Sequence, residues 1–290
     1  MTKGGRCAPA CLNPLSGGRS AATTMQAALA LIFCVSCGLL AMPAAGSEAG
    51  RVDLELVLAV DTSNSMDRGE LALQRAGYVE ALRDAAFVNA VPSGREGRIA
   101  LTYFEWSGTI REGSLIPWQI IDGPDSAIIF AAKLAAQPLG ALPGGGTSIS
   151  GAVTFGASLF GRGDIHGERR VIDISGDGPN NTGSPVATAR DKAVSDGVII
   201  NGLPILIRPS QMTAQMFGNL DLYYADCVTG GPGSFVLPIH AASEFATAIR
   251  YKLILEVSGL TARPETIEVR AEKPVDCLFG EHYRLLYPDP

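Results

Sequence analysis

The stretch that decides the fold reads Asp53-Leu-Glu-Leu-Val-Leu-Ala-Val60, and the polar segment Asp61-Thr-Ser-Asn-Ser65 follows it directly. The continuously apolar end of the first segment is typical of a strand that is covered on both faces. From Arg68 to Phe87, apolar residues recur at helical spacing, which predicts a helix. The folded part of the chain is therefore expected to begin with a buried strand, a polar turn and a helix.

The same alternation of strand and helix continues along the chain. Further strands are expected at Arg98 to Trp106, Leu115 to Ile121, Arg170 to Ser175, Val198 to Ile207 and Ser234 to Pro238. Further helices are expected at Pro124 to Ala136, Ser148 to Phe160, Ser184 to Gly197 and Ser243 to Val257. This pattern predicts an α/β fold with a doubly wound, mostly parallel sheet and helices on both faces. Pro117 favours a position at the sheet edge for its strand.

The N-terminus has the features of a targeting signal. Three basic residues (Lys3, Arg6 and Arg19) precede an uncharged apolar run from Met25 to Ala45, and small residues follow. Basic flank, apolar core and small exit residues predict a secretory signal at residues 1–46. We therefore expect an exported protein, periplasmic or secreted, with a domain at residues 51–257 and a tail at 258–290. The tail could hold one more strand, Thr266 to Arg270.

Two alternatives to a cleaved signal stay open. Residues 25–45 are nearly long enough to remain as a membrane anchor, which needs about 20 apolar residues. Cys37 could instead be a lipidated cysteine, although Cys34 stands where an aliphatic residue is expected. In every case, contact with a membrane is expected only through an uncleaved N-terminal segment.

The cysteines agree with export. Only Cys227 and Cys277 lie beyond the signal segment, and an exported protein can keep such a pair oxidised. A bridge between them would tie the tail to the domain. The alternative is two unpaired, buried cysteines.

The charge of the chain limits its partners. The net charge is -6 and the pI about 5.2, whereas binding to nucleic-acid phosphates requires an excess of Lys and Arg. We therefore expect no nucleic-acid partner. The proportions of hydrophobic (47%) and charged (18%) residues are those of a globular chain.

Oxygen-bearing side chains follow the predicted strands. Asp61, Ser63 and Ser65 follow the first strand, Asp177 lies in a Gly-Asp-Gly turn after a later one, and Thr147 comes after three glycines. Each of them alone is most simply a helix cap. Together they would converge where ligands bind in such sheets, outside the carboxyl ends of the strands. Oxygen ligands without Cys or His suit Mg²⁺, Mn²⁺ or Ca²⁺.

This order of motifs resembles the metal-ion-dependent adhesion site of von Willebrand factor type A domains. The resemblance covers roughly Val52 to Val257. It implies that Asp61, Ser63, Ser65, Thr147 and Asp177 hold one metal ion. The stretches Tyr103 to Gly108, Ile174 to Gly178 and Cys227 to Gly233 are also similar to a bacterial branch of exported A-type domains, the DUF1194 family.

The resemblance implies a binding function. In A domains, one coordination position is left for a Glu or Asp of the partner, so the expected partner is a protein or other macromolecule that presents an acidic side chain. The glycines before Thr147 would let its loop shift. On this basis we expect a non-catalytic, adhesion-type module and no enzyme.

Two other functions remain as alternatives. A metal-dependent hydrolase needs a general base near the metal, but His166, His240 and His282 all lie outside the motifs. Neither a Gly-x-Ser-x-Gly elbow nor a phosphate-binding Gly-Lys-Ser/Thr loop is present. A chaperone-like partner of an ATPase would act inside cells, against the predicted export.

Overall fold

The computed structural model describes residues 50–139, 145–207, 220–259 and 275–286. The predicted signal at 1–46 and the predicted strand Thr266 to Arg270 lie outside these residues. The strands are β1 (Arg51–Asp61), β2 (Ile99–Trp106), β3 (Ile110–Ile121), β4 (His166–Gly176) and β5 (Ile199–Pro204). The helices are α1 (Arg68–Arg83), α2 (Ala85–Ala90), α3 (Pro124–Ala135), α4 (Ile149–Leu159), α5 (Val186–Ser195), α7 (Leu220–Tyr223), α8 (Phe245–Ser258) and α9 (Phe279–Leu286). Among the described residues, no helix is both long and apolar enough to span a bilayer.

The strands form one sheet in the order β3-β2-β1-β4-β5. β1 pairs in parallel with β2 and with β4, and β4 pairs in parallel with β5. Only β3, which carries Pro117 at the sheet edge, runs antiparallel to its neighbour β2. The predicted α/β fold with a mostly parallel sheet is confirmed.

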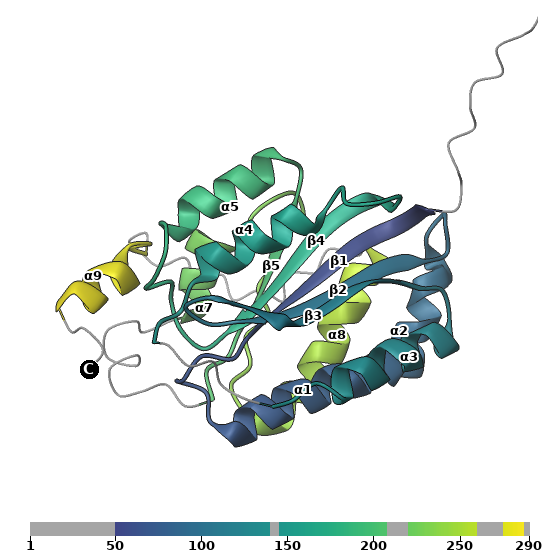
Figure 1. Cartoon of the computed structure of the whole chain (residues 1–290), viewed down its shortest axis with the longest axis horizontal. Coiled ribbons are helices and arrows are strands. Elements are labelled where there is room, and N and C mark those ends of the chain that lie inside the picture. The colour runs from purple at the N-terminus through teal and green to yellow at the C-terminus, as the bar shows by residue number, and fades with distance from the viewer. Residues whose placement is uncertain (1–49, 140–144, 208–219, 260–274, 287–290) are drawn as a thin grey trace, which may run out of the picture. The chain divides into compact units, whose positions relative to one another are not determined.

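Helices cover both faces of the sheet (Figure 1). α1, α3 and α8 pack on one face, and α4 and α5 pack on the other. Successive side chains of β1 point into opposite cores, so Leu56 and Leu58 enter one, and Val57 and Ala59 the other. This two-sided burial is the reason that the later part of β1, Leu56 to Val60, reads as an unbroken apolar run.

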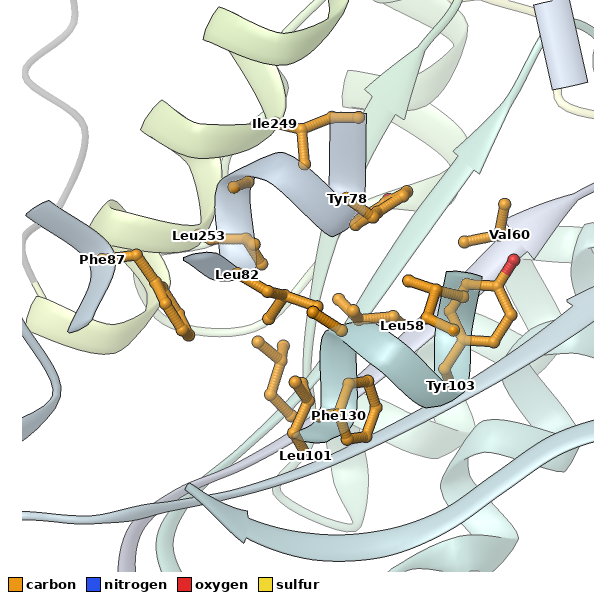
Figure 2. Close-up of a cluster of buried hydrophobic side chains, with 14 of the residues drawn as sticks. Leu58, Val60, Tyr78, Leu82, Phe87, Leu101, Tyr103, Phe130, Ile249 and Leu253 are labelled. Atoms are coloured by element: carbon orange, nitrogen blue, oxygen red, sulfur yellow. The ribbon is translucent and has the colours of Figure 1, made fainter. Parts of the chain in front are cut away.

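The core beneath α1, α3 and α8 is built around large side chains (Figure 2). Tyr78 and Leu82 of α1 meet Ile249 and Leu253 of α8 there, and all four are buried. The rings of Tyr78 and Tyr103 pack edge to face with their centroids 6.4 Å apart. Burying one such side chain contributes roughly 1.5–3 kcal/mol, so this layer fixes α1 and α8 against the sheet.

Some expected elements differ in the structure. The helix expected from Arg68 to Phe87 is divided at Asp84, whose side chain accepts a hydrogen bond from the backbone N–H of Ala86 and starts α2. The strand expected at Ser234 to Pro238 is reduced to isolated bridges, such as that of Val236 with Gly202. Pro238 has no N–H to continue a ladder.

Because β1 and β4 are parallel neighbours, their carboxyl ends lie at the same edge of the sheet. Val60 is paired with Ser175 there. The segments that follow, Asp61 to Ser65 and Gly176 to Gly178, are therefore brought side by side.

Candidate metal centre

Asp61 is the last residue of β1 and is fully buried. Its Oδ1 atom accepts a hydrogen bond of 2.7 Å from the backbone N–H of Ser63, which folds the chain into a tight turn. Its Oδ2 atom is buried and has no hydrogen-bond partner among the described residues. A buried carboxylate oxygen without a partner is costly, so this atom is suited to meet a cation.

Hydroxyl groups connect this turn to the end of β4. The Oγ atoms of Ser63 and Ser65 lie 2.9 Å apart, and Ser65 Oγ donates a hydrogen bond of 2.7 Å to Asp177 Oδ1. Ser63 is buried, whereas Ser65 is exposed. The structure thus brings Asp61, Ser63, Ser65 and Asp177 together at one edge of the sheet, with its outer side open to solvent.

Thr147 lies on the adjacent loop and is held by the chain that follows Asp177. Its backbone N–H donates to Asn181 Oδ1 at 2.8 Å, and its carbonyl accepts from the backbone N–H of Asn181 at 2.9 Å. The Thr147 hydroxyl lies 4.0 Å from the position that a Cβ atom would take at Gly178. It is therefore next to the Gly-Asp-Gly turn, as the sequence predicts.

The position of Gly176 shows how closely the segments pack. A Cβ atom here would come within 2.9 Å of Asp61 Oδ2 and within 2.7 Å of the Tyr224 hydroxyl. Both distances are too short for a real Cβ. Only glycine lets the end of β4 approach the buried carboxylate.

Both carboxyl groups are hard to ionise in the absence of a cation. Burial, and then the neighbouring Asp177, raise the pKa of Asp61 well above its ordinary value. Burial raises the pKa of Asp177 to about 6, and the charge of Glu70 adds to the rise although the Ser65 hydroxyl opposes it. A bound divalent ion would reverse both effects, so the electrostatics of this edge favour a positive ligand.

The donor set fits a hard cation. No group of three or more His, Cys, Asp or Glu side chains that could hold a metal occurs in the described residues. The predicted donors at this edge are two carboxylates and three hydroxyls. Such oxygen donors match Mg²⁺ or Mn²⁺ better than zinc. Asp61, Ser63, Ser65, Thr147 and Asp177 would hold the ion, and metal binding by them stays a prediction.

Three neighbours of the site were not predicted as parts of it. Glu70, the third residue of α1, closes a capping box with Asp67 and carries a charge that acts on Asp177. Asn180 accepts a hydrogen bond from the backbone N–H of Ser150, and so joins the loop after β4 to α4. Arg284 donates to the Thr182 hydroxyl. The capping-box pattern around Glu70 is a signal that the sequence does carry.

Cys227 and Cys277 form a disulfide bond. Cys227 lies in a π-helical turn, Tyr224–Val228, and is fully buried. Cys277 comes just before α9. The bond therefore ties the end of the chain to the body of the domain.

The strand order, the helices on both sheet faces and the oxygen-lined edge define a von Willebrand factor type A-like domain. The family described as a protein of unknown function (DUF1194) matches residues 51–261. The chain belongs to this family. No curated protein matches it.

Solved structures are similar in fold. Proximal thread matrix protein 1 from the mussel byssus superposes with a TM-score of 0.52 at 14% identity, over 72% of this chain and 49% of its own. The pilus adhesin SpaC from Lactobacillus rhamnosus GG gives 0.51 at 13% identity, over 72% of this chain and 31% of its own. This chain thus spans about half of the first and a third of the second. At these identities the similarity shows the fold alone.

Proposed function

We propose that this protein is a non-catalytic binding module that acts outside the cytoplasm and holds a carboxylate of a macromolecular partner through one divalent metal ion. Asp61, Ser63, Ser65, Thr147 and Asp177 would bind the ion. The observation that carries the proposal is the meeting of the buried carboxylate of Asp61 and the partly buried carboxylate of Asp177 with serine hydroxyls at the open edge of the sheet. The disulfide supports export.

The chemistry of the edge supports binding rather than catalysis. Of the three histidines, His166 starts β4 at the opposite end of the sheet from Asp177. His282 lies beside Asp276 on the C-terminal segment. His240 is exposed, and its backbone N–H donates to Glu244. Hydroxyl ligands add no charge, so two carboxylates nearly neutralise the ion and leave it attractive to one more carboxylate. The matrix protein and the pilus adhesin support a role in attachment by analogy of fold.

Metal binding can be tested through stability. A ligand that binds only the folded state, at about 100-fold above its Kd, stabilises it by about 2.7 kcal/mol. For a domain of this size that raises Tm by roughly 5–10 °C. We expect Mg²⁺ or Mn²⁺, compared with EDTA, to produce such a rise in the wild type and none in Asp61→Ala.

Asp191→Ala is the matched control, because this side chain is 69% exposed on α5 and lies outside the site. It should respond to metal like the wild type. An equal response of Asp61→Ala and Asp191→Ala would remove the assignment. Activity of the purified domain in a phosphatase and esterase screen, lost in Asp61→Ala, would favour the hydrolase instead.

The partner can be sought by capture from an envelope extract in Mg²⁺ and in EDTA. We expect a protein or polymer that is retained only with metal and is competed by a short acidic peptide. Recovery of the protein in the cytoplasmic fraction would instead favour the chaperone-like role.

A further inference from the structure

The segment Val275–Leu286, called here the C-terminal strap, lies against the loops of the candidate metal centre. It includes the disulfide-bonded Cys277 and continues as α9. Gly280 of α9 is buried, and a Cβ atom there would come within 2.1 Å of the Asn180 carbonyl oxygen. The backbone of the strap therefore packs directly on the loop that follows Asp177.

Two charged side chains of the strap bind this loop. Glu281 Oε1 accepts a hydrogen bond of 2.7 Å from the side-chain amide of Asn180. Asn180 is fully buried, and its Oδ1 atom accepts from the backbone N–H of Ser150. Glu281 thus orients a side chain that joins the Asp177 loop to α4.

Arg284 reaches both loops at once. Its guanidinium donates to the Thr182 hydroxyl, and a second nitrogen lies 3.4 Å from the Gly145 carbonyl oxygen. Gly145 precedes Thr147 in the first loop, and Thr182 follows Asn181 in the second, so both are near the contact between Thr147 and Asn181. Gly146, which lies between Gly145 and Thr147, has a φ of 107°. A Cβ atom at Gly146 would clash with the Arg284 guanidinium. Arg284 therefore limits the movement that the glycines would otherwise allow.

We propose that the C-terminal strap is a positioning element of the metal site, and that the Cys227–Cys277 bond makes cation affinity depend on the redox state. The effect on affinity rests on the proposed function. Metal sites require ligands placed to within a few tenths of an ångström, and the strap holds the two loops that carry Thr147 and Asp177. α9 has eight residues, too few to be a stable helix alone, so its position depends on its contacts with the Asp177 loop together with the disulfide.

This arrangement has a consequence for export. Cytoplasmic thiols are kept reduced, whereas the periplasm and the outside of the cell are oxidising. The strap would be released while the protein is in the cytoplasm and fastened after export. The site would therefore reach full affinity only where its partner is found.

The strap itself can be tested without metal. Hydrogen exchange of the EDTA-treated full chain should be faster around residues 145–148 and 180–184 after reduction, and in Cys277→Ser. Cys277 is the better position to change because Cys227 is fully buried. Exchange rates that are equal in the oxidised and reduced proteins would overturn the proposal, whatever the metal does.

The effect on the site is measured by calorimetric titration with Mn²⁺ alone. Losing one or two hydrogen bonds that hold the loops corresponds to roughly a 3- to 10-fold rise in Kd. We expect this rise on reduction, in Cys277→Ser and in Arg284→Ala, with partial recovery in Arg284→Lys. Leu285→Ala is the matched control, since Leu285 is in the same helix and 82% exposed.

The possible outcomes separate the two proposals. Absence of Mn²⁺ binding to the oxidised wild type rejects the proposed function, and hydrogen exchange still decides the strap. If Mn²⁺ binds equally to oxidised and reduced protein, the strap does not position the site. If Leu285→Ala weakens binding as much as Arg284→Ala, the effect is one of helix stability, and the role of Arg284 is wrong.

Discussion

This domain has two pairs of neighbouring carboxylates with different surroundings. In the core beneath α8, Asp173 of β4 and Glu256 of α8 share Lys252, whose Nζ lies 2.7 Å from Asp173 Oδ1. At the sheet edge, Asp61 accepts from the backbone N–H of Ser63 and Asp177 from the Ser65 hydroxyl. Among the described residues, no Lys, Arg or His forms an ion pair with either of these two.

The core cluster is closed. Lys252, Asp173 and Glu256 are all at most 2% exposed, and the Phe235 ring lies 5.2 Å from the lysine nitrogen. The side-chain amide of Asn201 donates to Glu256 at 3.0 Å. The chain itself supplies the cation here, and a solvent ion has no access.

The edge cluster is open and lacks such a cation. The comparison teaches that buried carboxylates alone do not identify a metal site in this fold. What distinguishes the edge is that neutral oxygen donors surround its two carboxylates and that the cluster faces solvent on one side. In the core, a lysine takes the position between the carboxylates.

The largest expected effect comes from removing the internal cation. Lys252→Met leaves Asp173 and Glu256 buried without a counter-charge, which should lower the free energy of unfolding by about 3–5 kcal/mol in urea denaturation. Lys192→Met is the control, because Lys192 is 76% exposed and pairs with an exposed Asp196. It should change stability by no more than about 0.5 kcal/mol. Equal effects of the two substitutions would show that the core cluster is not held by its lysine.

A smaller effect is expected from pH in the metal-free protein. Burial, then Glu256, raise the pKa of Asp173 to about 7 despite the attraction of Lys252, and burial raises that of Asp177 to about 6, both from 3.8. A folded state with raised carboxyl pKa values holds more protons than the unfolded chain, so its stability falls as pH rises from about 4 to 7. We expect urea denaturation in EDTA to give a lower free energy of unfolding at pH 7 than at pH 4.

The two clusters can be separated within the same titration. Asp177→Asn should make the fall less steep between about pH 4 and 6, where Asp173 still contributes, and should leave the fall from about pH 6 to 7, to which Asp173 contributes as well. Saturating Mg²⁺ should do the same to the wild type, because metal binding requires the ionised carboxylates. Stability that rises from pH 4 to 7 in EDTA would contradict both assignments.

The sequence predicts the edge cluster better than the core cluster, for a physical reason. Asp61 and Asp177 follow apolar strands directly, and parallel strands place such residues at one edge. Lys252 has no such signal, because a lysine within the amphipathic stretch Ser243 to Val257 is most simply a surface residue. Its burial depends on a carboxylate of a distant strand, a pairing that local pattern does not encode.

The C-terminal strap illustrates a second limit. The sequence predicts the Cys227–Cys277 pair by elimination among the cysteines, and the structure has the bond. α9 was not predicted, since eight residues carry too little helical periodicity and the helix depends on contacts with the Asp177 loop. The strand predicted at Ser234 to Pro238 forms only isolated bridges. Here the local apolar pattern is present, but a strand also needs a neighbour with which it can form a complete ladder of hydrogen bonds.

The smallest effect is the most specific to the edge, because its sign should change with metal. In EDTA, Asp177→Asn removes the repulsion between the Asp61 and Asp177 carboxylates but keeps an oxygen for the Ser65 hydroxyl. We expect it to raise the free energy of unfolding by about 1 kcal/mol. In saturating Mg²⁺ the wild type should become the more stable protein. The crossing is measured by urea denaturation of both proteins with EDTA and with Mg²⁺. An Asn variant that is less stable in both conditions would mean that the Asp177 carboxylate supports the fold even without a bound metal ion.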